Sequence, residues 1–92
     1  MQSWWHTMEI KVPARFYQDH TDRSNTPELL VDAVIKDSGS YLFVELNDDQ
    51  IANLLSDAEY YADGVDYPEL RGLQKSAKAT VKAINTQVKC VA

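Results

Sequence analysis

The stretch that decides the fold is Leu29–Leu46, LLVDAVIKDSGSYLFVEL, in which two apolar runs flank a turn sequence. Ser38-Gly39 stands where a tight hairpin turn forms. The run Tyr41–Leu46 alternates between two faces, as a half-buried strand does. If Lys36 pairs with Tyr41, one face of the hairpin is wholly apolar and holds Leu29, Val31, Ala33, Ile35, Leu42, Val44 and Leu46. We therefore predict two antiparallel strands joined at Ser38-Gly39.

The first of these runs admits a second interpretation. Thr26-Pro27-Glu28 is typical of the start of a helix, with proline in the first turn. The β-branched residues Val31, Val34 and Ile35 favour a strand instead. The shared apolar face favours the hairpin, and residues 27–36 stay ambiguous between strand and helix.

Upstream of this stretch, Met8–Val12 alternates apolar and polar residues, which predicts a short strand with one buried face. Pro13 ends the strand and suits the first turn of a helix, because its φ angle is preset and it has no N–H to leave unpaired. A helix over Ala14–Arg23 then places Phe16 and His20 one turn apart on one side.

Two helices are predicted downstream. Asn47 and Gln50 form a capping box, and Gly64 is placed to end the first helix in a left-handed cap. A D-x-x-E box at residues 66–69 starts the second helix, which runs to about Lys89. Their core stripes recur at helical spacing and comprise Ile51, Leu54, Leu55, Ala58 and Ala62, then Leu70, Leu73, Ala77, Val81, Ile84 and Val88.

The predicted order is therefore β-α-β-β-α-α, a small α+β fold whose short antiparallel sheet is covered by the two C-terminal helices. A chain of 92 residues has room for one domain, which we place at residues 8–92, with residues 1–7 as a loose leader. Hydrophobic residues make up 45% and charged residues 25%, a mix typical of globular proteins and not of disordered ones.

Composition also excludes several classes of protein. The single cysteine, Cys90, can form neither an internal disulfide nor a multi-thiolate metal site. His6 and His20 lack the spacing of zinc ligands, so we expect no metal and no cofactor. No apolar run approaches the roughly 20 residues of a membrane span. We expect a cytoplasmic protein with no membrane association.

Charge is segregated along the chain, whose net charge is −5. Residues 48–69 carry seven acids and no lysine or arginine, whereas residues 70–92 carry five bases and no acid. On a helix the bases fall within roughly 60° of arc. We call this the basic stripe: Arg71, Lys75, Lys78, Lys82 and Lys89. It is either a solvated face or a contact for nucleic-acid phosphates or an acidic protein, without aromatic residues for reading bases.

Two further surfaces could bind a protein. An acidic, tyrosine-bearing patch comprises Asp57, Tyr60, Asp63, Asp66 and Tyr67; exposed tyrosines on a solvated helix are the alternative. A face of small residues comprises Gly72, Ser76, Ala79 and Ala83. That face either packs against the helix at residues 48–63 or forms the seam of a homodimer.

No arrangement of residues predicts catalysis. In the proposed hairpin Asp32 faces Glu45, but paired carboxylates need a dry cleft for acid–base work. Asp19, His20 and Asp22 are residue types that bind metal ions, but their spacing does not predict a metal site. We expect His20 to pack beside Phe16. We predict a non-enzymatic protein with no catalytic residues.

Three stretches, Val12–His20, Leu54–Asp63 and Leu70–Ile84, together resemble small uncharacterised proteins of tailed bacteriophages and bacteria. The resemblance covers most of the chain after Met8 and carries no catalytic residues over. It implies the cytoplasm of a bacterial host and a phage accessory protein that binds a host or phage macromolecule. We therefore expect a small interaction protein with an unidentified protein partner; the alternative is a nucleic-acid-binding accessory protein that uses the basic stripe.

Overall fold

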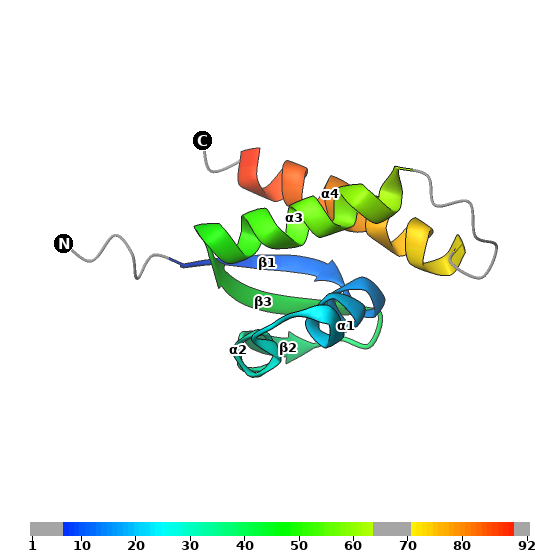
Figure 1. The fold of residues 1–92 in the computed structure, drawn as a ribbon. Coiled ribbons are helices and arrows are strands. Elements are labelled where there is room, and N and C mark those ends of the chain that lie inside the picture. Colours follow the sequence, from blue (N-terminus) through cyan, green and yellow to red (C-terminus); the bar gives the residue numbers. More distant parts are fainter. Residues whose placement is uncertain (1–6, 64–70, 90–92) are drawn as a thin grey trace.

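The computed structural model describes residues 7–63 and 71–89 and has the predicted α+β architecture (Figure 1). An antiparallel sheet of three strands packs against helices from both halves of the chain. The elements are β1 Thr7–Pro13, α1 Ala14–Arg23, α2 Pro27–Asp32, β2 Val34–Asp37, β3 Tyr41–Asn47, α3 Asp48–Ala62 and α4 Arg71–Lys89. Thr7, expected in the leader, is the first residue of β1 and pairs with Asn47.

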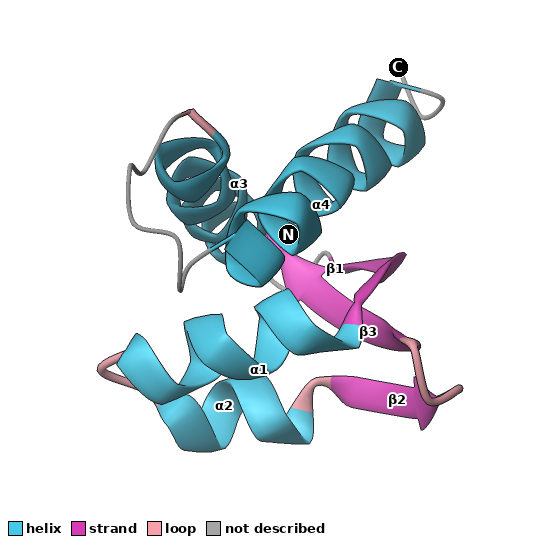
Figure 2. Ribbon diagram, turned by 90° about the vertical axis from the view of Figure 1, so that its right-hand side faces the viewer, coloured by secondary structure: helices cyan, strands magenta, loops and turns pink. Residues whose placement is uncertain are grey.

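The sheet has the order β1-β3-β2, so β3 lies in the centre and β1 and β2 are its edges. Its inner face is fully buried and comprises Ile10, Val12, Leu42, Val44 and Leu46. Figure 2 shows α3 and α4 as one pair of helices and α1 and α2 as another. On the outer face, Phe43 lies between the ammonium groups of Lys11 and Lys36, 5.9 and 5.7 Å from its ring centroid.

Residues 27–36 correct one sequence prediction, because they do not form a single strand. Pro27–Asp32 is the helix α2, and only Val34–Asp37 belongs to the sheet. The hairpin at Ser38-Gly39 is confirmed, with Gly39 at φ 90°. Its register is different from the predicted one, since Lys36 pairs with Phe43 and not with Tyr41.

Residues 27–32 follow the helix start at Thr26-Pro27 and not the strand preference of the β-branched residues. As a helix, the segment inserts Leu30 into the core and turns Leu29 and Val31 towards solvent. A strand would have buried both of these residues on the sheet face. The irregularity between Val34 and Lys36 then resets the register of β2.

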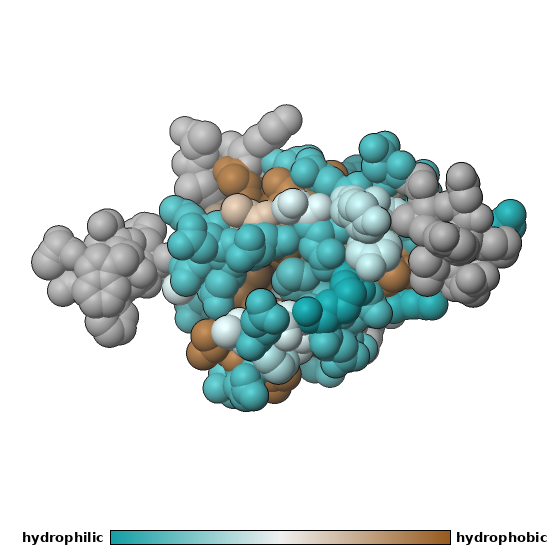
Figure 3. All heavy atoms as spheres, viewed as in Figure 1, coloured by the Kyte–Doolittle hydropathy of each residue, from teal (hydrophilic) through white to brown (hydrophobic). Residues whose placement is uncertain are grey.

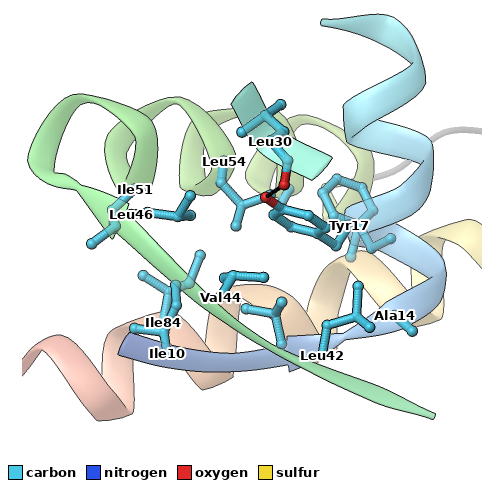
Figure 4. Close-up of a cluster of buried hydrophobic side chains, with 14 of the residues drawn as sticks. Ile10, Ala14, Tyr17, Leu30, Leu42, Val44, Leu46, Ile51, Leu54 and Ile84 are labelled. Carbon is cyan, nitrogen blue, oxygen red and sulfur yellow. Dashed lines mark hydrogen bonds between the residues drawn. The ribbon is translucent and has the colours of Figure 1, made fainter. Parts of the chain in front are cut away.

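The core lies between the inner sheet face and the helices (Figure 4). Leu54 and Leu73 are buried as the helical spacing predicts. Leu55 and Val81, also predicted to be core residues, are half-buried and pack against the same cluster.

Tyr17 of α1 fixes the position of α2. Its hydroxyl donates a hydrogen bond of 2.6 Å to the carbonyl oxygen of Leu30, drawn as a dashed line in Figure 4. Burial raises the pKa of Tyr17 from 10.0 to about 12. The hydroxyl therefore stays protonated and keeps donating at any physiological pH.

We expect Tyr17→Phe to lower the free energy of unfolding by about 1–3 kcal/mol at pH 7, because the Leu30 carbonyl loses its donor. The unfolded chain ionises Tyr17 above pH 10.0, whereas the folded protein does so only near 12. The raised pKa stabilises the fold fully below pH 10.0, and this contribution is lost as the pH rises through 12. Urea titrations should show the gap between wild type and variant narrowing by about 2 kcal/mol over that interval. A constant gap would contradict this explanation.

The outer edge of β1 is covered by one side chain of α4. Gln87 accepts a hydrogen bond from the Lys11 N–H through Oε1 and donates one to the Lys11 carbonyl through Nε2, both 2.8 Å long. The amide of Gln87 thus takes the place of a neighbouring strand. Covering an edge in this way blocks pairing with another chain.

We expect Gln87→Ala to lower the free energy of unfolding by about 1–2 kcal/mol, because two backbone groups of Lys11 lose their partner. Gln87→Glu should recover only part of this loss, since a carboxylate accepts from the N–H but cannot donate to the carbonyl. The exposed residue Asn85, changed to Ala, is the control and should leave the urea midpoint in place. Equal stability of all three variants would refute the role of the amide.

Candidate functional site

Three aliphatic side chains are exposed on α2 and β2. Leu29 is 57% exposed, Val31 60% and Ile35 54%. We call these three residues the α2–β2 patch. Figure 3 shows brown surface at the lower edge of the molecule, where Figure 1 places α2. The sequence analysis put all three residues on a buried sheet face, so the α2–β2 patch is a correction as well as a candidate site.

A groove of about 290 Å³ lies beside the α2–β2 patch, between α1, α2 and β2. Its lining comprises Tyr17, Gln18, Thr21, Asp22, Val31, Val34, Asp37 and Leu42. Val34 and Leu42 supply apolar wall, and both charged lining residues, Asp22 and Asp37, are acidic. The two cations adjacent to these acids in sequence are engaged elsewhere: Arg23 pairs with Asp19 and Asp57, and Lys36 places its ammonium over Phe43 on the outer sheet face.

The edge of β2 differs from the edge of β1. β2 pairs with β3 on one side only. Within residues 7–63 and 71–89, no side chain forms a hydrogen bond to the backbone of β2, whereas Gln87 covers Lys11 of β1. The groups of β2 that point away from β3 are therefore open to a further strand.

A polar cluster joins α1 to α3. The Nδ1 atom of His20 lies 2.7 Å from Oδ2 of Asp57, and the guanidinium of Arg23 forms ion pairs with both Asp57 and Asp19. Arg23 also lies over the ring of Tyr61, 4.5 Å from its centroid. The sequence analysis did not foresee this cluster, although the i,i+4 spacing of Asp19 and Arg23 is a readable signal.

An Asp–His pair can serve as a general base when a nucleophile contacts the imidazole. In the described part of the chain, no hydroxyl or thiol forms a hydrogen bond to His20. The ring instead stacks on Phe16, with centroids 6.4 Å apart, as the sequence predicts. The arrangement joins α1 to α3.

The acidic, tyrosine-bearing patch is only partly assembled. Asp57 is half-buried and paired with His20 and Arg23, and its role as a contact residue stays a prediction. Tyr60 is 72% exposed, and Asp63 is exposed at the end of α3. Asp66 and Tyr67 lie outside the described residues, as do the D-x-x-E box and Gly64.

The basic stripe faces away from the core. Arg71, Lys75, Lys78 and Lys82 are exposed on the side of α4 opposite its buried residues. Lys89 ends α4, and its side chain lies outside the description. None of the ion pairs among the described residues involves the stripe.

The small-residue face of α4 does not act as one surface. A Cβ placed on Gly72 would lie 2.6 Å from Nη1 of Arg15, so the guanidinium of α1 covers this glycine. Ser76 and Ala83 are half-buried, whereas Ala79 is exposed. The helix α3 does pack along α4. A homodimer seam through this face stays a prediction.

Among the described residues, no group of three or more potential ligands comes together to hold a metal ion. Asp19 and His20 are instead engaged by Arg23 and Asp57. No described helix is long and apolar enough to cross a bilayer. No family model, no curated protein and no solved structure matches the chain.

Proposed function

We propose that this protein is a non-enzymatic interaction domain that binds another protein through the α2–β2 patch. The observation that carries the proposal is the exposure of Leu29, Val31 and Ile35 on two consecutive elements. Single exposed aliphatic residues are ordinary, but here three lie within seven positions of the chain, and one of them, Val31, lines the groove. Each contributes apolar area that a partner would remove from water.

The α2–β2 patch is held in place before any partner arrives. Leu30 anchors α2 in the core, and the hydroxyl of Tyr17 binds its carbonyl group. Val34 and Asp37 hold β2 against β3. A surface fixed in this way costs little ordering entropy on binding, which favours a stable complex from a small contact area.

The setting we propose is the cytoplasm of a bacterial host, with a host or phage protein as the partner. The resemblance to phage and bacterial proteins supports this setting, and a single cysteine fits a reducing compartment.

The test is affinity capture from a bacterial lysate with the wild type and two variants of matched fold. Val31→Ser/Ile35→Ser reduces the apolar area of the patch, and both sites are exposed, so stability should be retained. Lys75→Gln/Lys78→Gln/Lys82→Gln alters only the basic stripe. The proposal requires a partner that the serine variant loses and the glutamine variant retains. A partner retained by the serine variant would overturn it.

The second candidate function is binding of nucleic acid through the basic stripe. The specific observation is that four of its cations are exposed and lie outside every ion pair of the described residues. Such a face attracts phosphates, and no aromatic residue lies within it to stack on bases.

We expect Lys75→Gln/Lys78→Gln/Lys82→Gln to keep the thermal midpoint of the wild type, because exposed charges contribute about 0–1 kcal/mol each. If the second candidate is correct, the wild type binds duplex or single-stranded DNA with an affinity that falls steeply with salt, and the variant does not bind. Absence of binding at low salt removes this candidate. Unfolding of the variant would show that these lysines are structural.

A further inference from the structure

The edge of β2 and the groove beside it form a single surface. The strand edge offers backbone donors and acceptors, since β2 has a neighbour on one side only. Val34 and Asp37, which line the groove, belong to that same strand. A chain added beside β2 would direct alternate side chains towards the helix side of the sheet, where the groove opens.

The size of the groove suits one side chain better than a small-molecule ligand. Its volume of about 290 Å³ is just under the roughly 300–1,000 Å³ of pockets for drug-sized ligands. Tyr17 and Leu42 offer apolar surface to a long alkyl stem. The hydroxyl of Tyr17 already donates its hydrogen bond to the carbonyl oxygen of Leu30, so it does not donate to a side chain in the groove.

The charges that line the groove favour a bound side chain with a cationic end. Among the described residues that line it, Asp22 and Asp37 are the charged ones, and both are anionic. Asp37 uses Oδ1 to accept the Gly39 N–H at 2.8 Å, which fixes the carboxylate within the turn. An alkyl stem with a cationic head is the chemistry of lysine and arginine, which place the stem on apolar surface and the charge at its rim.

We propose, on the basis of the function proposed above, that this surface binds an extended peptide segment as a further strand on β2, with a lysine or arginine side chain in the groove between Asp22 and Asp37. The α2–β2 patch then receives aliphatic residues of the same segment. Backbone pairing supplies part of the affinity, and the groove supplies the preference for a cation.

The experiment uses a displayed library of random linear nonapeptides, selected on the immobilised full chain. We expect the enriched peptides to carry a lysine or arginine flanked at alternate positions by aliphatic or β-branched residues. Asp22→Asn/Asp37→Asn should weaken their binding by about tenfold or more, measured by calorimetry on synthetic peptides. Asparagine keeps the acceptor for the Gly39 N–H, so the turn should persist in this variant.

Glu59→Gln/Asp63→Asn is the matched control, because it removes the same charge from exposed sites on α3. Enriched peptides without a basic residue, or equal binding to both double variants, would overturn the inference. So would the absence of any enriched peptide. The proposed function would still stand if lysate capture yields a folded partner that depends on Val31 and Ile35. If the protein instead forms a concentration-dependent dimer that Ile35→Lys abolishes, the proposal of a bound peptide is overturned. The β2 edge is then occupied by a second copy of this chain.

Discussion

Leu54→Ala is expected to lower the free energy of unfolding by about 2–5 kcal/mol, the range for a leucine truncated in a packed core. Leu54 is fully buried on α3, and Figure 4 draws it close to Tyr17 and Leu30. The truncation leaves a cavity in the core cluster that Leu54 shares with Leu30 and Tyr17. Urea unfolding followed by far-ultraviolet circular dichroism measures the loss.

The same truncation at Leu29 is the matched control. Leu29 belongs to α2 but faces solvent, so Leu29→Ala should change the free energy of unfolding by less than about 0.5 kcal/mol. The pair of variants separates a helix at residues 27–32 from the strand that the apolar pattern favoured, since the strand would bury Leu29. Similar losses at both positions would contradict the observed fold.

Asp57→Ala is expected to lower the free energy of unfolding by about 1–3 kcal/mol, as much as Tyr17→Phe. The substitution removes the acceptor that His20 and Arg23 share and so loosens the contact between α1 and α3. Arg23 keeps its ion pair with Asp19, which limits the loss. The side chain of Asp57 is 23% exposed, so solvent also replaces part of the interaction.

Asp57→Asn should lose less than Asp57→Ala, because an amide oxygen still accepts one hydrogen bond. Glu59→Ala, two residues along the same helix and exposed, should leave the unfolding midpoint nearly unchanged. If the unfolding midpoint of Asp57→Ala equals that of Glu59→Ala, the polar cluster contributes nothing to the free energy of unfolding. In any binding assay Asp57 must therefore be treated as a structural residue.

Local rules were sufficient for most elements of the fold. The capping box of Asn47 and Gln50 is present with both hydrogen bonds, and α3 starts where it predicts. The positions of β1, α1 and the turn at Ser38-Gly39 also follow from proline and turn residues and from the spacing of apolar residues. In these segments the local signal and the tertiary contacts agree.

Residues 27–36 could not be assigned because two local signals compete there. A period-2 apolar face and a proline helix start coincide, and the choice depends on tertiary contacts that no local pattern contains. The contacts that decide it are the burial of Leu30 and its bond to Tyr17 across 13 positions of sequence. The strand interpretation places Leu29, Val31 and Ile35 on a buried face, whereas the structure exposes all three.

Residue types alone also did not reveal the partners of Asp57. Asp57 belongs to an acidic run, so it was grouped with Tyr60 and Asp63, although its partners His20 and Arg23 come from α1. By contrast, the exposure of the lysines of α4 follows directly from helical spacing, because the basic stripe and the buried face lie on the same helix. The spacing of residues along one helix does not show which side chains of another helix they contact.

The central claim is that the α2–β2 patch and the edge of β2 bind the partner. Amide hydrogen exchange of the full chain, with and without the partner captured by the wild type, tests it most directly. We expect slower exchange in residues 27–37 on binding, with residues 71–89 unchanged. Protection confined to residues 71–89, with residues 27–37 exchanging as in the free protein, would contradict the claim and assign binding to α4.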